Sequence, residues 1–202
     1  EALRSSIRIM KESGAHAVKL EGGREVKDSV ERILSAGIPV MGHLGLTPQS
    51  IYKFGTYTVR AKEEAEATKL IEDAKMLEQC GCFGMVLEKI PASLAKEVSE
   101  AIHIPTIGIG AGPDADGQVL VTHDVLGLFD RFTPKFVKKY ANLHAEMRKA
   151  FADVVLENKS YGLPVIQWRQ GRGVVEVPAE QLEPLARRIL EVNGEPLPEA
   201  EE

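Results

Sequence analysis

Short apolar runs in the sequence end in side chains that can bind ions or substrates and transfer protons. These side chains are, in chain order, Lys19 with Glu21, then His43, then Glu88, and then His123 with Asp124. The carboxyl ends of parallel strands form the working face of α/β folds. We therefore interpret these residues as candidates for substrate binding and acid–base chemistry.

Most of these candidates also have a purely structural interpretation. Lys19 and Glu21 are two residues apart, on the same side of an extended strand, and could form only an ion pair. His43 could serve only to cap a turn, and the pair His123 and Asp124 could serve only to order a loop. Both interpretations stay open for these positions.

Glu88 is harder to explain structurally. It directly follows Met85-Val86-Leu87, and a carboxylate beside such an apolar strand costs free energy unless it is bound or has a shifted pKa. We therefore favour a functional role for Glu88.

The elements that would position these residues alternate between strands and helices. Strands are predicted at 17–20, 38–41, 83–87, 105–109 and 118–121. Helices are predicted at 2–13, 26–34, 65–80, 92–102 and 133–157. Strands that are apolar on both faces and alternate with amphipathic helices indicate a parallel sheet covered by helices. The candidates should then converge at the carboxyl ends of adjacent strands.

Two connections depart from this regular pattern. Only about eight residues separate the last two strands, fewer than the dozen of an ordinary parallel crossover, so we favour a tight connection without a helix over the loss of the last strand. The long insert at 43–61 has the length of a lid over a barrel mouth. The glycines between Gly108 and Gly112 match no nucleotide-binding motif. They suggest a backbone that a substrate or a neighbouring loop approaches closely.

Residues 164–202 differ in character from the rest of the chain. Val165–Trp168 and Val174–Val177 flank a glycine-rich turn and predict a hairpin. Pro178–Val192 then has helical periodicity, and the acidic tail from Gly194 is expected to be disordered. We interpret 1–163 as one domain and 164–202 as an appended module.

The composition excludes several classes of protein. The formal net charge is -5, which argues against a nucleic-acid binder and favours small-molecule partners. Cys80 and Cys82 are too close together for a relaxed disulfide and too few for a zinc site. We expect reduced thiols in a cytoplasmic protein, and no apolar run has the roughly 20 residues needed to cross a membrane. The start at Glu1 suggests that a further segment precedes it.

Five blocks of the sequence, in this order, resemble the ketopantoate hydroxymethyltransferase family. The blocks are Val18–Gly23, Gly42–Ser50, Val86–Glu88, Ile104–Gly112, and Asp116–Val121 with His123-Asp124. The block Gly-His-Leu-Gly-Leu-Thr-Pro-Gln-Ser is highly specific, and the resemblance extends from residue 1 to about residue 163.

The resemblance implies a (β/α)8 TIM barrel of the phosphoenolpyruvate-mutase/isocitrate-lyase superfamily. It implies transfer of a hydroxymethyl group from 5,10-methylenetetrahydrofolate to 3-methyl-2-oxobutanoate, with Mg²⁺, in a homo-oligomer. By position in the motifs, Glu88 matches the general base, and Lys19 and His43 match substrate-binding residues. Glu21 matches a residue on the metal side. Mg²⁺ and Lys19 would stabilise the charge of an enolate.

The chain departs from the family in two ways. Only about five of the eight barrel strands have a counterpart, without the aspartates that hold the metal, and residues 164–202 match no usual family tail. The chain is therefore expected to be a fragment, a chimera or an engineered protein, and to bind metal weakly or not at all by itself. An inactive structural half-barrel and a related lyase of the superfamily are the alternatives.

Overall fold

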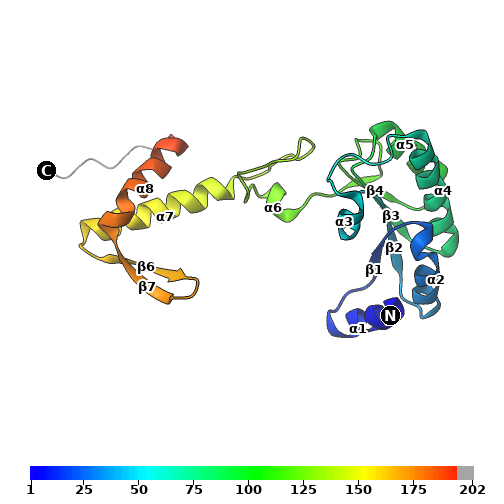
Figure 1. Ribbon diagram of the computed structural model, residues 1–202, viewed down its shortest axis with the longest axis horizontal. Coiled ribbons are helices and arrows are strands. Elements are labelled where there is room, and N and C mark those ends of the chain that lie inside the picture. The colour runs from blue at the N-terminus through cyan, green and yellow to red at the C-terminus, as the bar shows by residue number, and fades with distance from the viewer. Residues whose placement is uncertain (195–202) are drawn as a thin grey trace. The chain divides into compact units, whose positions relative to one another are not determined.

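The computed structural model describes residues 1–194 and divides the chain into two compact units (Figure 1). The first runs from Glu1 to Leu120, and the second begins at Val121. The division falls well before residue 164, so the predicted appended module lies within the second unit together with residues that precede it. The expected disordered tail at 195–202 lies outside the described residues.

The first unit contains a five-stranded parallel sheet in the order β1-β2-β3-β4-β5. The strands are β1 (Val18–Glu21), β2 (Val40–Gly45), β3 (Gly84–Glu88), β4 (Thr106–Ile109) and β5 (Gly117–Gln118). The predicted five parallel strands in chain order are thus confirmed. The sheet is the open, parallel arrangement expected of a partial α/β barrel.

Three helices of the first unit, α2, α4 and α5, lie in a row along one side of this sheet (Figure 1). The helical elements are α1 (Ala2–Glu12), η1 (Arg24–Val26), α2 (Lys27–Ser35), η2 (Pro48–Ser50), α3 (Ile51–Phe54), α4 (Glu64–Cys80) and α5 (Ala92–Ala101). Alternate strand residues, among them Val40 and Leu87, join Leu77 of α4 in the buried core. The intervening strand residues point to the opposite face.

β2 differs from its predicted bounds, because it begins two residues later than expected and continues through Gly45. His43 therefore lies inside the strand and does not follow it. Gly42, His43 and Gly45 pair with β3, although glycine and histidine give no strand signal in the sequence. Pairing with the neighbouring strand determines this boundary. The segment 46–63, here called the insert, connects β2 to α4.

The tight connection between β4 and β5 is confirmed, since Ile107 pairs with Gly117 in parallel without an intervening helix. The predicted strand end at residue 121 is wrong, because β5 ends at Gln118. Asp116 stabilises this connection, because one of its carboxylate oxygens accepts hydrogen bonds from the amide and the hydroxyl of Thr106, at 2.8 and 2.9 Å. Thr106 is fully buried.

The second unit combines helices with a hairpin. Its elements are α6 (Thr122–Val125), α7 (Leu143–Ser160), β6 (Pro164–Arg169), β7 (Gly173–Pro178) and α8 (Ala179–Asn193). β6 and β7 pair antiparallel, so the predicted hairpin and the helix after it are confirmed. Val155 of α7, Val165 and Ile189 share one buried core.

The long helix predicted from residue 133 begins only at Leu143. The amides of Tyr140, Leu143 and His144 bond instead to the carbonyls of residues 125, 126 and 127, and Asn142 caps the helix by accepting a hydrogen bond from the Ala145 amide. The preceding residues therefore run alongside the end of α6.

The cysteines agree with prediction, since both are free and Cys80 ends α4. Burial raises the pKa of the Cys82 thiol to about 11. Within residues 1–194, no helix is both long enough and apolar enough to cross a membrane.

Candidate active site

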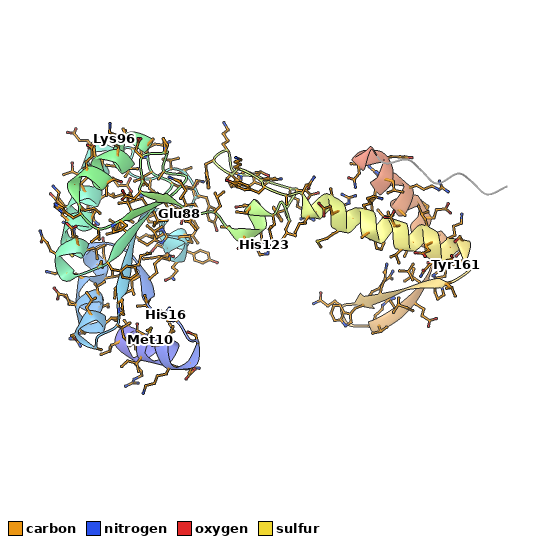
Figure 2. The ribbon with its side chains drawn as sticks, turned by 180° about the vertical axis from the view of Figure 1, so that it is seen from behind. Met10, His16, Glu88, Lys96, His123 and Tyr161 are labelled. Carbon is orange, nitrogen blue, oxygen red and sulfur yellow. The ribbon has the colours of Figure 1, made fainter. Side chains whose placement is uncertain are left out.

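Lys19, Glu21, His43 and Glu88 lie on the face of the sheet opposite the helices. Their side chains alternate with the core residues of β1, β2 and β3, and the strand register sets Glu21 beside His43 and Gly45 beside Glu88. Figure 2 shows Glu88 on the first unit. The predicted convergence of these four residues is therefore confirmed.

The four side chains form a continuous polar chain. Lys19 Nζ lies 2.9 Å from His43 Nδ1 and 3.8 Å from Glu21 Oε1. On the other side of the imidazole, His43 Nε2 lies 3.3 Å from Glu88 Oε2. The His43 side chain is only 3% exposed and that of Glu88 is 17% exposed, whereas the Lys19 side chain is 42% exposed. This row of polar side chains thus runs from the solvent-facing ammonium of Lys19 to the partly buried carboxylate of Glu88.

The contact with Lys19 assigns the proton on the His43 ring. An ammonium group can only donate, so Nδ1 must accept and the ring proton lies on Nε2. Nε2 is buried and has no partner in hydrogen-bond geometry, although Glu88 is 3.3 Å away. A proton donor is thus held beside the Glu88 carboxylate with its hydrogen bond unused. A substrate oxygen that entered here would find a donor and a base side by side.

The structural interpretations of Lys19 and His43 do not account for this geometry. Lys19 does lie near Glu21, but its shorter contact is with His43. His43 lies within β2 and caps no turn. Both residues belong to one polar cluster.

Gly45 allows the ends of β2 and β3 to approach closely beside Glu88. Its φ is +93°, and a Cβ at this position would lie 2.2 Å from the Glu88 carbonyl oxygen. The Leu46 amide donates to the same oxygen at 2.8 Å. The backbone of Glu88 is therefore held by the first residue of the insert.

The insert also contacts Glu21. The Gln49 amide donates to Glu21 Oε2 at 2.8 Å. Glu21 borders a cavity of about 320 Å³ whose lining includes Phe54 and Arg60 of the insert. The guanidinium of Arg60 lies 4.3 Å from the centre of the Phe54 ring and forms an ion pair with Glu66. Lys19, His43 and Glu88 are not in the lining, so the cavity adjoins the polar chain at Glu21 alone.

Comparison with known proteins matches residues 1–164 to the model of the ketopantoate hydroxymethyltransferase family. The chain belongs to this family. Relatives named 3-methyl-2-oxobutanoate hydroxymethyltransferase align over 164 residues, 69% identical in Flavobacterium johnsoniae, 70% in Christiangramia forsetii and 68% in Cytophaga hutchinsonii. Each alignment covers 81% of this chain but 60% of the relative, so the chain spans well under two thirds of the length of these proteins.

The match to the ketopantoate hydroxymethyltransferase family ends inside the second unit. It includes α7 and stops at residue 164, the first residue of β6. α7 shares its core with the hairpin and with α8, which lie beyond the match. The family sequence and the unmatched sequence therefore fold together in that unit.

Two predicted candidates of this family member lie outside the first unit. His123 and Asp124 lie in α6 of the second unit, not at the end of a strand of the sheet. The structure also adds a residue that no sequence pattern selects. Lys89 follows Glu88 with a left-handed backbone, φ +46°, and contacts the insert.

The described residues do not by themselves form a Mg²⁺ site. Mg²⁺ takes near-octahedral oxygen coordination, commonly with one or two carboxylates and several waters. Here Glu21 offers one carboxylate, with one oxygen already accepting from Gln49 and the other 3.8 Å from the Lys19 ammonium. Among residues 1–194, no three acidic, histidine or cysteine side chains are grouped to hold a metal.

Proposed function

We propose that this chain carries the proton-abstracting half of a ketopantoate hydroxymethyltransferase site. The substrate would be 3-methyl-2-oxobutanoate, the one-carbon donor 5,10-methylenetetrahydrofolate and the product 2-dehydropantoate. Family membership supports the reaction class. The observation that carries the proposal is the contact of His43 Nε2 with Glu88 Oε2, a donor beside a base on one sheet face.

Each residue of the polar chain has a role in this proposal. Glu88 takes the C3 proton of the 2-oxo acid, which leaves an enolate that needs stabilisation. His43 donates its Nε2 proton in a hydrogen bond to a substrate oxygen. Lys19 holds His43 in the required tautomer and neutralises the substrate carboxylate or the developing oxyanion.

Water adds to the methylene carbon of 5,10-methylenetetrahydrofolate, both of its C–N bonds break, and tetrahydrofolate leaves with the two water protons on its nitrogens, which yields formaldehyde. The enolate carbon then bonds to the formaldehyde carbon, and the resulting alkoxide takes the proton held by Glu88 to give the hydroxymethyl group. Mg²⁺ would act as a Lewis acid on the keto oxygen when bound. Glu21 is proposed as one of its ligands, although no group of three acidic, histidine or cysteine side chains suited to a metal is found among residues 1–194.

The resemblance to the family also supports proposals about the fold, the cellular location and the oligomeric state. We propose that the sheet represents five strands of a TIM barrel of the phosphoenolpyruvate-mutase/isocitrate-lyase superfamily. A cytoplasmic location is supported by the two free cysteines. We also predict that the protein forms a homo-oligomer, binds small molecules and does not bind nucleic acid.

Substitution of Glu88 tests the proposed base. Glu88→Gln keeps the shape of the side chain and removes the base, so exchange of the C3 proton of 3-methyl-2-oxobutanoate should fall by about 10²-fold or more. Exchange is followed by NMR in D2O and needs no folate. Substrate binding, measured separately by calorimetry, should change little.

The matched control is Glu100→Gln, the same change on the exposed end of α5, which should exchange at the parent rate. If Glu88→Gln exchanged at the parent rate, the base would have to be another group, with His43 the next candidate. If the parent chain showed no exchange with Glu88 intact, an inactive half-barrel would replace the enzyme proposal.

A further inference from the structure

Two residues other than glycine have left-handed backbones within the described part of the chain, and they lie on the two sides of one contact. Ala61 has φ +52° and Lys89 has φ +46°. Between them, the Arg60 amide donates to the Lys89 carbonyl at 2.8 Å. Residues other than glycine adopt the left-handed backbone conformation only at a cost in conformational free energy, and such residues concentrate at functional sites. Their pairing here marks the contact between the insert and the end of β3.

Lys89 connects three segments through its backbone and side chain. Its amide donates to Ile109 O at 2.9 Å, at the end of β4, and its carbonyl accepts from Arg60. Its ammonium donates to Tyr57 O at 2.5 Å. Tyr57 and Arg60 both lie in the insert. A single residue next to Glu88 thus holds the C-terminal part of the insert at two points.

The N-terminal part of the insert is fixed to Glu21, through the bond from the Gln49 amide. The insert is therefore attached at one end to the carboxylate of Glu21 and at the other end to Lys89, the residue directly after Glu88. Phe54, which lies between these two attachments, and Arg60, which forms part of the second, line the cavity beside Glu21. The position of the cavity wall consequently depends on both attachments.

The backbone of Glu88 does not depend on the Lys89 side chain. Gly45 and Ile109 flank Glu88 in the sheet, and the Leu46 amide binds its carbonyl. Loss of the Lys89 ammonium would leave these bonds in place and remove only the attachment to Tyr57. The effect should fall on the insert and on the cavity, not on the position of the base.

We propose that Lys89 is a positioning residue that clamps the insert over the cavity beside Glu21 and so sets the affinity of the site for its 2-oxo acid substrate. The clamp follows from the geometry alone. Its effect on affinity rests on the proposed function.

The clamp is tested by hydrogen exchange of the full chain, without substrate. Lys89→Met keeps the length of the side chain and removes the ammonium, so exchange of the Arg60 and Ala61 amides should accelerate about tenfold. Lys89→Arg, which can still donate to Tyr57 O, should restore slow exchange. Lys96→Met is the matched control: Lys96 lies on α5, away from the insert, in an exposed pair with Glu100 (Figure 2).

Kinetics of C3 proton exchange then separate affinity from turnover. For Lys89→Met, KM for 3-methyl-2-oxobutanoate should rise about fivefold while kcat changes by less than about twofold. Lys89→Arg should return KM toward the parent value. A variant that had merely lost folded protein would lower kcat and leave KM unchanged.

The two measurements can refute the clamp and the proposed function separately. Equal amide exchange in the parent, Lys89→Met and Lys96→Met would overturn the clamp, whatever the activity. A fall in kcat at constant KM, measured at equal amounts of folded protein, would show that Lys89 acts on the base and would also overturn the proposal as stated. Absence of proton exchange in the parent would count against the proposed function alone, with the clamp still decided by the amide measurement.

Discussion

At the residue scale, the ring of His43 lies between Lys19 and Glu88 and contacts both. Because the ammonium of Lys19 can only donate, it determines which nitrogen of His43 carries the proton, and this nitrogen faces Glu88. Replacing Lys19 would therefore alter the donor beside the base as well as the local charge. The three residues form one contact network, so we expect the effects of their substitutions not to be additive.

Asp116 offers a residue-scale prediction about pH. The amide and then the hydroxyl of Thr106 hold the pKa of this carboxyl below its ordinary value. Its charged form is favoured in the folded state, so its contribution to stability is present above about pH 4 and is lost as pH falls through the lower folded pKa. Asp116→Asn should lower the urea midpoint most above about pH 5, and the difference from the parent should vanish at lower pH.

The measurement is urea unfolding of both proteins across this pH range, followed by circular dichroism. The effect should be small, because Asp116 is exposed. A difference between the two proteins that stayed constant with pH would show that the carboxylate charge contributes nothing.

Sequence reasoning identified the four clustered residues because parallel strands bring their carboxyl ends together. The position of each after an apolar run was sufficient for Glu88 and for the pair Lys19 and Glu21. It was insufficient for Lys89, since one lysine after a strand is ordinary and nothing in the sequence signals a left-handed backbone. The same criterion, a position after an apolar run, was misleading for His123, because the last strand ends at Gln118, five residues before that histidine.

At the element scale, the boundaries that could not be predicted are those determined by neighbouring strands and helices. β2 extends through Gly45 because β3 pairs with it to that point. α7 begins ten residues late because the amides of Tyr140, Leu143 and His144 bond to residues at the end of α6. Elements with strong periodicity, such as α4, were predicted to within one residue.

The glycine-rich segment after β4 gives the element-scale prediction. Gly112 has φ +85°, and a Cβ there would lie 2.4 Å from Ala92 Cβ, in the first residue of α5. The expected close approach therefore involves a neighbouring helix. Gly112→Ala should destabilise the first unit by roughly 1–3 kcal/mol, measured by urea unfolding.

Gly14→Ala is the control for backbone strain. Gly14 has a similar φ of +69°, but its Cβ would have open space, so this variant reports the cost of the left-handed backbone alone. Equal losses in the two variants would mean that crowding against Ala92 contributes nothing.

At the scale of the whole molecule, the matched family sequence continues past the sheet and into the second unit. α7 lies within the match, yet its core partners Val165 and Ile189 lie beyond it. The sequence predicted a module after residue 163, because composition and turn signals change there. The unit itself begins at Val121, and within it α7 shares a core with α8 and the hairpin.

Metal binding is the prediction for the whole molecule. Glu21 alone cannot supply the oxygen ligands that Mg²⁺ needs, so titration of this chain with Mg²⁺ in a calorimeter should give weak heat without saturation, or none. Glu21→Gln should leave that result unchanged. Tight, stoichiometric binding by the parent would contradict the prediction and would require further ligands within the chain.

The short β5 has a consequence for the protein at high concentration. An open parallel sheet exposes two edges, and each is a template on which a strand from another molecule can form hydrogen bonds. At one edge β5 offers only two residues before the chain leaves the sheet, whereas β1 at the other edge offers four. We therefore expect edge-to-edge aggregation to favour β1, where the charges of Lys19 and Glu21 oppose it.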